Sequence, residues 1–103
     1  MVQLGWKAGT EQYSPDELLE YAIAAEVAGF DSIDASDHFH PWAEKGQACF
    51  VWTWLGAVAA KTKQITLGTG VTCPTFRYHP AVVAQAAATV AWLAPKRFFL
   101  GVG

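Results

Sequence analysis

Residues 36–42 bring together side chains that exchange protons and side chains that can enclose a ligand. The segment has the sequence Ser-Asp-His-Phe-His-Pro-Trp and follows a strand-like run. Imidazole titrates near neutral pH, so His38 is a candidate base or acid for proton transfer. The alternative is a histidine that only hydrogen-bonds to a neighbouring loop. Trp42 can line a ligand site or donate its indole N–H to a ligand, or it can pack between a helix and a loop.

The spacing of His38 and His40 raises the question of a metal site. Residues two apart on a strand face the same way, so both imidazoles are able to ligate one ion. Further ligands are needed, and the remaining acidic and imidazole side chains do not form a second cluster in the sequence. Pro41 indicates that the chain has already left the strand. We therefore expect no metal here.

Two later segments also contain residues suited to a binding site. Residues 68–74, Gly-Thr-Gly-Val-Thr-Cys-Pro, let the backbone approach a flat ring closely or simply form a tight strand exit. Neither this segment nor residues 101–103 form a nucleotide-binding fingerprint. Arg77, Tyr78 and His79 precede the helix that Pro80 begins. They are placed to reach an anionic group, or Arg77 pairs with a carboxylate from a neighbouring loop.

Four strands and three helices are predicted to position these segments. The strands are expected near residues 3–6, 31–35, 64–69 and 97–102, and the helices over residues 14–28, 48–62 and 80–94. Ser14 and Glu17 predict a capping box for the first helix, and Gly29 predicts its end.

Burial is predicted from the apolar spacing. The expected apolar stripe of the first helix comprises Leu19, Ala22, Ile23 and Val27. The second helix is expected to carry Phe50, Trp54 and Val58 on one face. Trp52, Trp54 and Trp92 are expected to be structural, and the fourth strand is expected to be buried on both faces.

The alternation of elements predicts an α/β fold. Strand–helix–strand units of about 30 residues give right-handed crossovers and a parallel sheet. Four such strands correspond to the first half of a (β/α)8 TIM barrel, so we expect a fragment that would leave an apolar sheet edge exposed. A complete flavodoxin-like domain is the competing interpretation, but it would have a fifth strand and a final helix.

Composition excludes several classes of protein. The chain has 103 residues, 52% of them hydrophobic, and a net charge of −2, which indicates one globular domain. There is no basic field for nucleic acid and no basic patch or apolar span for a membrane. Cys49 and Cys73 are isolated thiols and no signal peptide is visible, so a cytoplasmic protein is expected.

Five segments together resemble a known family. They are residues 7–12, 36–42, 67–71, 74–78 and 99–103. They are similar to the N-terminal part of the luciferase-like oxidoreductases that use the deazaflavin coenzyme F420. The nearest branch contains glucose-6-phosphate dehydrogenases and secondary-alcohol dehydrogenases. The resemblance implies a luciferase-like (β/α)8 barrel, of which residues 1–103 would be the N-terminal part of a single domain, truncated after the fourth strand.

The resemblance also implies roles for individual residues. His38 would take the hydroxyl proton of the substrate while a hydride passes to the deazaflavin, Trp42 would hold the substrate, and Glu11 would lie near the reacting centre. Asp37 would contact the cofactor. Gly70 and Val71 match a non-prolyl cis peptide that bulges against the ring, and Cys73 stands where a threonine usually contacts the cofactor.

The implied function is an F420-dependent dehydrogenase acting on an alcohol or a sugar phosphate, and the full-length protein would be a homodimer. Gly70 in place of serine and Cys73 in place of threonine weigh against the sugar phosphate. The family's proton-donating glutamate lies beyond Gly103, so this chain alone is expected to be inactive. Two alternatives stay open: an FMN-dependent luciferase-like monooxygenase, and a non-catalytic half-barrel that assembles with another chain.

Overall fold

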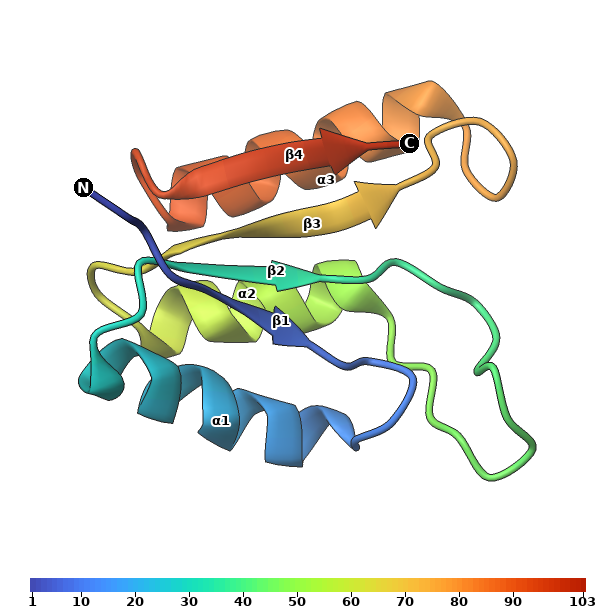
Figure 1. Cartoon of the computed structure of the whole chain (residues 1–103). Helices are drawn as coiled ribbons and strands as arrows, with labels where there is room; N and C mark the ends of the chain where they lie inside the picture. The colour runs from blue at the N-terminus through green and yellow to red at the C-terminus, as the bar shows by residue number, and fades with distance from the viewer.

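Strands and helices alternate along the whole chain in the computed structural model, which describes residues 1–103. The elements are β1 (Gly5–Ala8), α1 (Pro15–Ala28), β2 (Ser32–Ala35), α2 (Val51–Lys61), β3 (Thr66–Thr72), α3 (Pro80–Leu93) and β4 (Phe98–Val102). The strands form one parallel sheet in the order β1-β2-β3-β4, and the helices lie together on one face of it (Figure 1). The predicted α/β class and parallel sheet are confirmed.

The ends of the elements differ from the prediction in two places that matter for the site. β1 begins at Gly5, because its pairing with β2 starts at the Gly5–Ser32 pair. β3 continues to Thr72, so Gly70 and Val71 belong to a strand and not to the loop after it. Its pairing with β4 is irregular between Thr69 and Thr72.

Local signals set the bounds of α1 as expected. The Glu17 carboxylate accepts from the Ser14 backbone N–H at 3.1 Å and from the Ser14 hydroxyl at 2.7 Å. Gly29 ends the helix in the left-handed conformation, with φ of 91°. Glycine adopts this conformation without the steric cost that a Cβ would bring.

The apolar stripe predicted for α1 is wrong in part: Ala22 is buried and Leu19 packs against the core, as expected. The buried residues are Leu18, Ala22 and Ala25, whereas Ile23 is exposed and Val27 is 84% exposed. The face with short side chains lies against the sheet, because alanine allows the helix backbone to approach closely. Leu18 is the one long apolar side chain on this buried face, whereas Ile23 and Val27 point outward.

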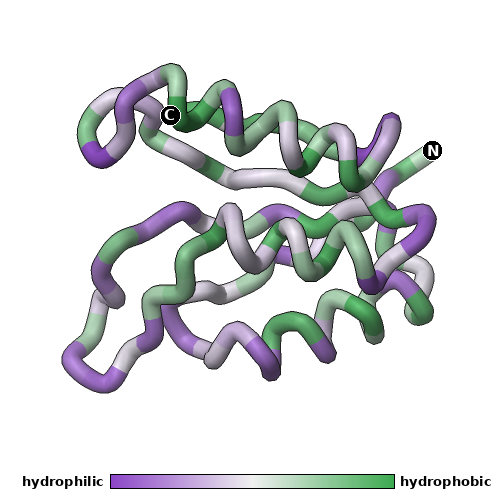
Figure 2. Tube along the Cα trace, turned by 180° about the vertical axis from the view of Figure 1, so that it is seen from behind, coloured by the Kyte–Doolittle hydropathy of each residue, from purple (hydrophilic) through white to green (hydrophobic).

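The core lies between the sheet and the helices. Ile33 and Leu67 contribute from the strands, and Leu55 and Val58 contribute from α2. The apolar stretches of the helices can be followed in Figure 2. Trp54 is buried, and its indole N–H donates to the Pro15 carbonyl at 3.1 Å, which joins α2 to α1.

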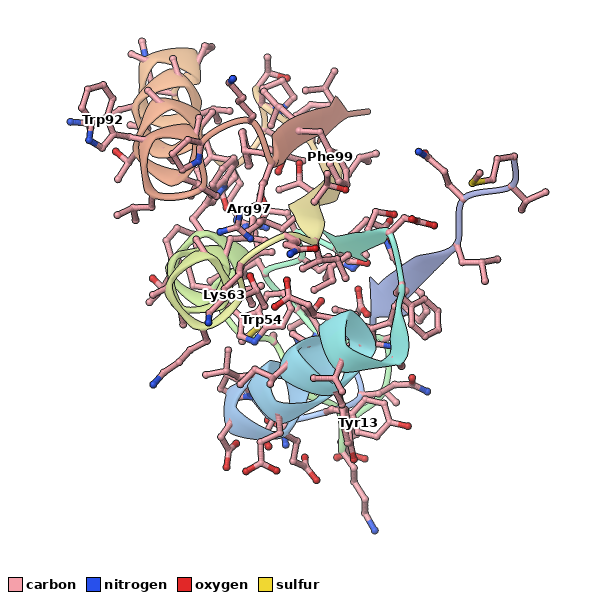
Figure 3. All side chains as sticks on the ribbon, turned by 90° about the vertical axis from the view of Figure 1, so that its left-hand side faces the viewer. Tyr13, Trp54, Lys63, Trp92, Arg97 and Phe99 are labelled. Carbon is pink, nitrogen blue, oxygen red and sulfur yellow. The ribbon has the colours of Figure 1, made fainter.

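Some expectations about burial are wrong. Trp52 is buried as predicted, but Trp92 is 84% exposed on the outer side of α3, where no element packs against it (Figure 3). Phe50 is also exposed, because it lies at the N-cap of α2 and not inside the helix.

β4 is not buried on both faces. Phe98 packs against the core, but Phe99, Leu100 and Val102 are exposed. β4 lies at an edge of the sheet, and no element covers the face opposite the helices (Figure 1). The expected apolar edge is therefore present. None of the three helices has the length and apolar character needed to cross a bilayer.

Polar clamps hold the sheet end where the strands begin. The Glu26 carboxylate accepts from the N–H groups of Lys63, Gln64 and Ile65 at 2.8–3.0 Å. Arg97 donates to the carbonyls of Ala59 at 3.0 Å and Ile65 at 3.1 Å (Figure 3). These contacts join α1, the end of α2 and the starts of β3 and β4.

Candidate active site

The candidate residues gather at the end of the sheet where the strands finish. The loops that follow β1, β2 and β3 all leave the sheet at this end (Figure 1). In parallel α/β folds, side chains in such loops converge from different strands, which is how residues far apart in sequence form one site.

His38 and Glu11 form the central pair of this site. Glu11 lies in the loop after β1 and His38 in the loop after β2, and the imidazole Nδ1 contacts Glu11 Oε1 in an ion-pair geometry. The Glu11 side chain is 7% exposed, and that of His38 is 41% exposed. A carboxylate accepts the proton of Nδ1–H, which leaves Nε2 unprotonated and able to accept a proton.

Trp42 lies beside this pair. The centroids of its indole and of the His38 imidazole are 5.8 Å apart, with an angle of 47° between the rings. The Trp42 side chain is 80% exposed, so its indole is available to a bound molecule. The two rings together form an apolar corner next to a proton-accepting nitrogen.

Asp37 occupies a different position from its neighbour His38. Its side chain is 1% exposed, and Thr72 donates to Oδ2 at 2.9 Å while Tyr78 donates to Oδ1 at 2.8 Å. Arg77 also pairs with Oδ1. Of the two interpretations of Arg77, pairing with a carboxylate from a neighbouring loop is therefore confirmed. Burial, followed by the hydrogen bond to Asp37, raises the pKa of Tyr78 to about 12.

The end of β3 contributes backbone and small side chains. The Gly70–Val71 bond is a non-prolyl cis peptide, as the resemblance implied, and Val71 is exposed. The Lys7 ammonium donates to the Gly70 carbonyl and pairs with Asp34 at 3.0 Å. A Cβ at Gly70 would lie 2.2 Å from Asp34 Oδ2, so a larger residue there would displace this ion pair.

The two cysteines lie in different surroundings. Backbone N–H groups of Thr75 and Phe76 lower the pKa of the half-buried Cys73 thiol. Burial raises the pKa of the Cys49 thiol. Cys73 follows β3 directly, at the same end of the sheet as His38.

The remaining imidazoles have local partners. His40 donates from Nδ1 to the Pro41 carbonyl at 2.7 Å, and His79 accepts from the Ala81 N–H at 3.1 Å at the start of α3. No group of three or more histidine, cysteine, aspartate or glutamate side chains is arranged to hold a metal ion.

A cavity lies beside the His38–Glu11 pair. Its volume is ≈ 380 Å³, and Lys7, Glu11, Gln12, Ser36 and Trp42 are among the residues that line it. A groove of ≈ 330 Å³ between α2 and α3 lies on the helical side of the molecule, and its only titratable lining residue is Tyr78. The chemistry-bearing side chains therefore adjoin the first cavity.

Sequence reasoning missed the contacts that depend on strand register. Thr72 and Lys7 lay in segments that were singled out at the ends of predicted strands, but their partners were not identified, because a threonine or lysine in a short strand has no local signal of its partner. Only the pairing of Lys7 with Asp34 across β1 and β2 reveals that ion pair. Glu11 was identified only through the family resemblance.

The comparisons with known proteins agree with this arrangement. The model of the luciferase-like monooxygenase family matches residues 2–103. An F420-dependent glucose-6-phosphate dehydrogenase of Mycobacterium avium (strain 104) is 58% identical over 103 residues, which are 99% of this chain and 31% of the relative. The corresponding enzyme of Mycobacterium tuberculosis (strain CDC 1551 / Oshkosh) is 53% identical over 103 residues, with the same shares covered.

Solved structures give the same result. An F420-dependent secondary alcohol dehydrogenase in complex with an F420-acetone adduct superposes with a TM-score of 0.94 and 46% identity, over 98% of this chain and 31% of that chain. The coenzyme F420 dependent tetrahydromethanopterin reductase from Methanopyrus kandleri superposes with a TM-score of 0.82 and 27% identity, over 99% of this chain and 27% of that chain.

Coverage is one-sided in all of these matches, since the chain spans 31% of the length of the curated relatives it matches. The order β1α1β2α2β3α3β4 is that of the first half of a luciferase-like TIM barrel. The family match over residues 2–103 and the superposition with the secondary alcohol dehydrogenase agree, and the chain therefore belongs to the luciferase-like monooxygenase family.

Proposed function

We propose that the full-length protein is an F420-dependent dehydrogenase. It would transfer a hydride from the hydroxyl-bearing carbon of an alcohol or a sugar phosphate to the cofactor. The contact between His38 and Glu11 is the observation that carries this proposal, because it provides a proton acceptor with a fixed orientation. The similar proteins named above support F420 as the cofactor.

His38 would act as the base. Because Glu11 accepts from Nδ1, the lone pair of the imidazole would lie on Nε2, and the His38 side chain is 41% exposed. Removing the hydroxyl proton there makes it easier for a hydride to leave the same carbon. Glu11 would hold the ring in this tautomer and orientation, as a carboxylate does for a catalytic histidine.

The residues present fit a flat, partly apolar cofactor. Trp42 and Val71 expose apolar surface at the ends of adjacent strands, and His38 lies between an open region and Glu11. Coenzyme F420, when bound, supplies the deazaflavin ring that accepts the hydride. Gly70, Val71 and Cys73 would contact this ring, and Trp42 would hold the substrate against His38.

Asp37 stays a predicted cofactor contact. Its carboxylate is buried and engaged by Thr72, Arg77 and Tyr78, and its carbonyl accepts from Arg77, so the backbone N–H of residue 37 is the polar group left for a ligand.

The rest of the barrel would complete the pocket. We infer from the 31% coverage that residues 1–103 form the N-terminal part of a single barrel domain whose later units supply further ligand contacts. A homodimer is proposed for the full-length protein. Both cysteines are free thiols, which fits the cytoplasm as its compartment.

Two histidine substitutions in the full-length protein test the role of His38. His38→Ala is expected to lower the rate of deazaflavin reduction by an alcohol about 10²–10⁴-fold, because the general base is lost. Glu11→Gln is expected to cause a smaller loss. His40→Ala is the matched control, since His40 contacts only a neighbouring carbonyl. Deazaflavin reduction by His38→Ala at the wild-type rate would refute the assignment.

An FMN-dependent monooxygenase is the second candidate, because the matching family model is described as that of the luciferase-like monooxygenases. Purified full-length protein would be mixed with F420 and with FMN in separate titrations. The absorption spectrum of the retained cofactor distinguishes the two proposals, and retention of FMN alone would favour the monooxygenase.

A further inference from the structure

The carboxylate of Asp37 holds together two segments that are distant in sequence. Thr72 lies at the end of β3, and Arg77 and Tyr78 lie in the loop before α3. All three donate to the Asp37 carboxylate, and Arg77 Nη1 also donates to the Asp37 carbonyl at 3.3 Å. The side chain and the backbone of one residue are therefore both fixed.

The next residue, His38, has few restraints of its own. Its single polar partner is Glu11, and residues 39–50 after it contain no helix or strand. Arg77 also contacts two aromatic rings. Its guanidinium lies 6.0 Å from the ring centroid of Phe39, in the loop after His38, and 4.7 Å from that of Tyr78. The start of the loop is thus held by Asp37, together with the hydrogen bond that Thr10 Oγ1 donates to the Ser36 carbonyl at 3.1 Å.

We propose that Thr72, Arg77 and Tyr78 position His38 by holding Asp37. Asp37 and its three partners are called the Asp37 brace, and its members are positioning residues that do not touch the reacting atoms. This inference rests on the proposed function in one respect, since it assumes that His38 is the base. An imidazole must lie within hydrogen-bond reach of the hydroxyl to remove its proton.

The chain offers substitutions that remove one hydroxyl and leave the rest of the side-chain shape unchanged; the Tyr78 hydroxyl also accepts from Arg77. Thr72→Val and Tyr78→Phe each delete one hydroxyl that donates to Asp37. Thr66→Val is the matched control, because Thr66 lies at the opposite end of the same strand and donates to the Asp31 carbonyl at 3.0 Å. The three variants would be made in the full-length protein.

Steady-state kinetics with F420 and an alcohol substrate provide the first measurement. Thr72→Val and Tyr78→Phe are expected to lower kcat about tenfold or more, because a misplaced base loses its alignment with the substrate hydroxyl. KM and Tm are expected to stay close to those of Thr66→Val. If both variants keep the kcat of Thr66→Val, the proposal is wrong.

Amide hydrogen exchange of residues 37–42 provides a measurement that needs no turnover. Exchange in this segment is expected to be about tenfold faster in Thr72→Val and Tyr78→Phe than in Thr66→Val. Unchanged exchange would overturn the brace. A wild-type protein that reduces no F420 would overturn the proposed function alone, and exchange would still decide on the brace.

A double-mutant cycle separates the brace from independent contacts. Asp37→Asn and Tyr78→Phe remove two sides of one interaction, so their combined effect on kcat is expected to be smaller than the product of their separate effects. Multiplicative effects would show that the residues act independently and would contradict the proposal.

Discussion

Neighbouring residues in the loop after β2 have opposite environments. The Asp37 carboxylate is buried among three donors, whereas the His38 imidazole keeps one face open. Asp37 therefore fixes the structure of the loop, whereas the next residue, His38, is free to exchange a proton.

Tyr78 gives a prediction at alkaline pH. Because its folded pKa is raised to about 12, the neutral phenol is favoured in the folded state. The stability that it contributes is present below the ordinary tyrosine pKa of about 10 and is lost as the pH rises from there towards 12. Tyrosinate absorbance should therefore show one late-titrating tyrosine that Tyr78→Phe lacks. Identical curves above pH 10 would contradict the Asp37–Tyr78 contact.

At the scale of elements, a side chain supplies the hydrogen-bond acceptor for backbone N–H groups where α1 meets the start of β3. Glu26 projects from the last turn of α1 and accepts from three consecutive amides before β3. Burial opposes its ionisation, but the bonds to Ile65, Gln64 and Lys63 outweigh it and lower the pKa of the Glu26 carboxyl. The charged form therefore joins α1 to β3.

Glu26→Ala is expected to lower the free energy of unfolding by about 1–2 kcal/mol at neutral pH, because three amides lose their acceptor. The contribution of Glu26 is present above the ordinary carboxyl pKa and is lost as the pH falls through its lowered folded value. Denaturant unfolding at several pH values should show the difference from wild type shrinking in acid. Glu20→Ala, in the same helix but exposed, serves as the control. A difference that stays constant with pH would contradict this role.

The sequence predicted the order of the elements, because caps and apolar runs are local signals. Ser14, Glu17 and Gly29 placed the ends of α1 for this reason. It did not predict which face of α1 is buried or how Thr72 reaches Asp37. Both depend on how the elements pack, and Asp37 and Thr72 are 35 residues apart in the chain.

His38 was identified from its residue type and its place after a strand. Glu11 needed the family resemblance, because no local pattern links it to a histidine 27 residues away.

At the scale of the whole molecule, the sheet is covered on one face only. Phe99, Leu100 and Val102 are exposed on an edge strand, and Lys7 and Asp34 lie on the uncovered face. In the relatives, about two thirds of the sequence lies outside the matched region, which provides ample chain to cover this surface.

Residues 1–103 produced alone are expected to reduce no F420, because the later units of the barrel would supply the rest of the pocket. The exposed apolar strand is expected to cause self-association. Size-exclusion chromatography and a deazaflavin assay check both statements, with the full-length protein as the control. A folded monomer that turns over substrate would contradict them.

The clamps made by Glu26 and Arg97 have a consequence for engineering. They hold the end of the sheet where the strands begin, while the loop over residues 39–50 leaves from the opposite end. Substitutions at exposed positions of that loop, such as Glu44 and Lys45, would therefore cause little loss of folded protein. The same number of substitutions over residues 59–65 would disturb the partners of Glu26 and Arg97. Most of those variants would then fail to fold before their activity could be selected.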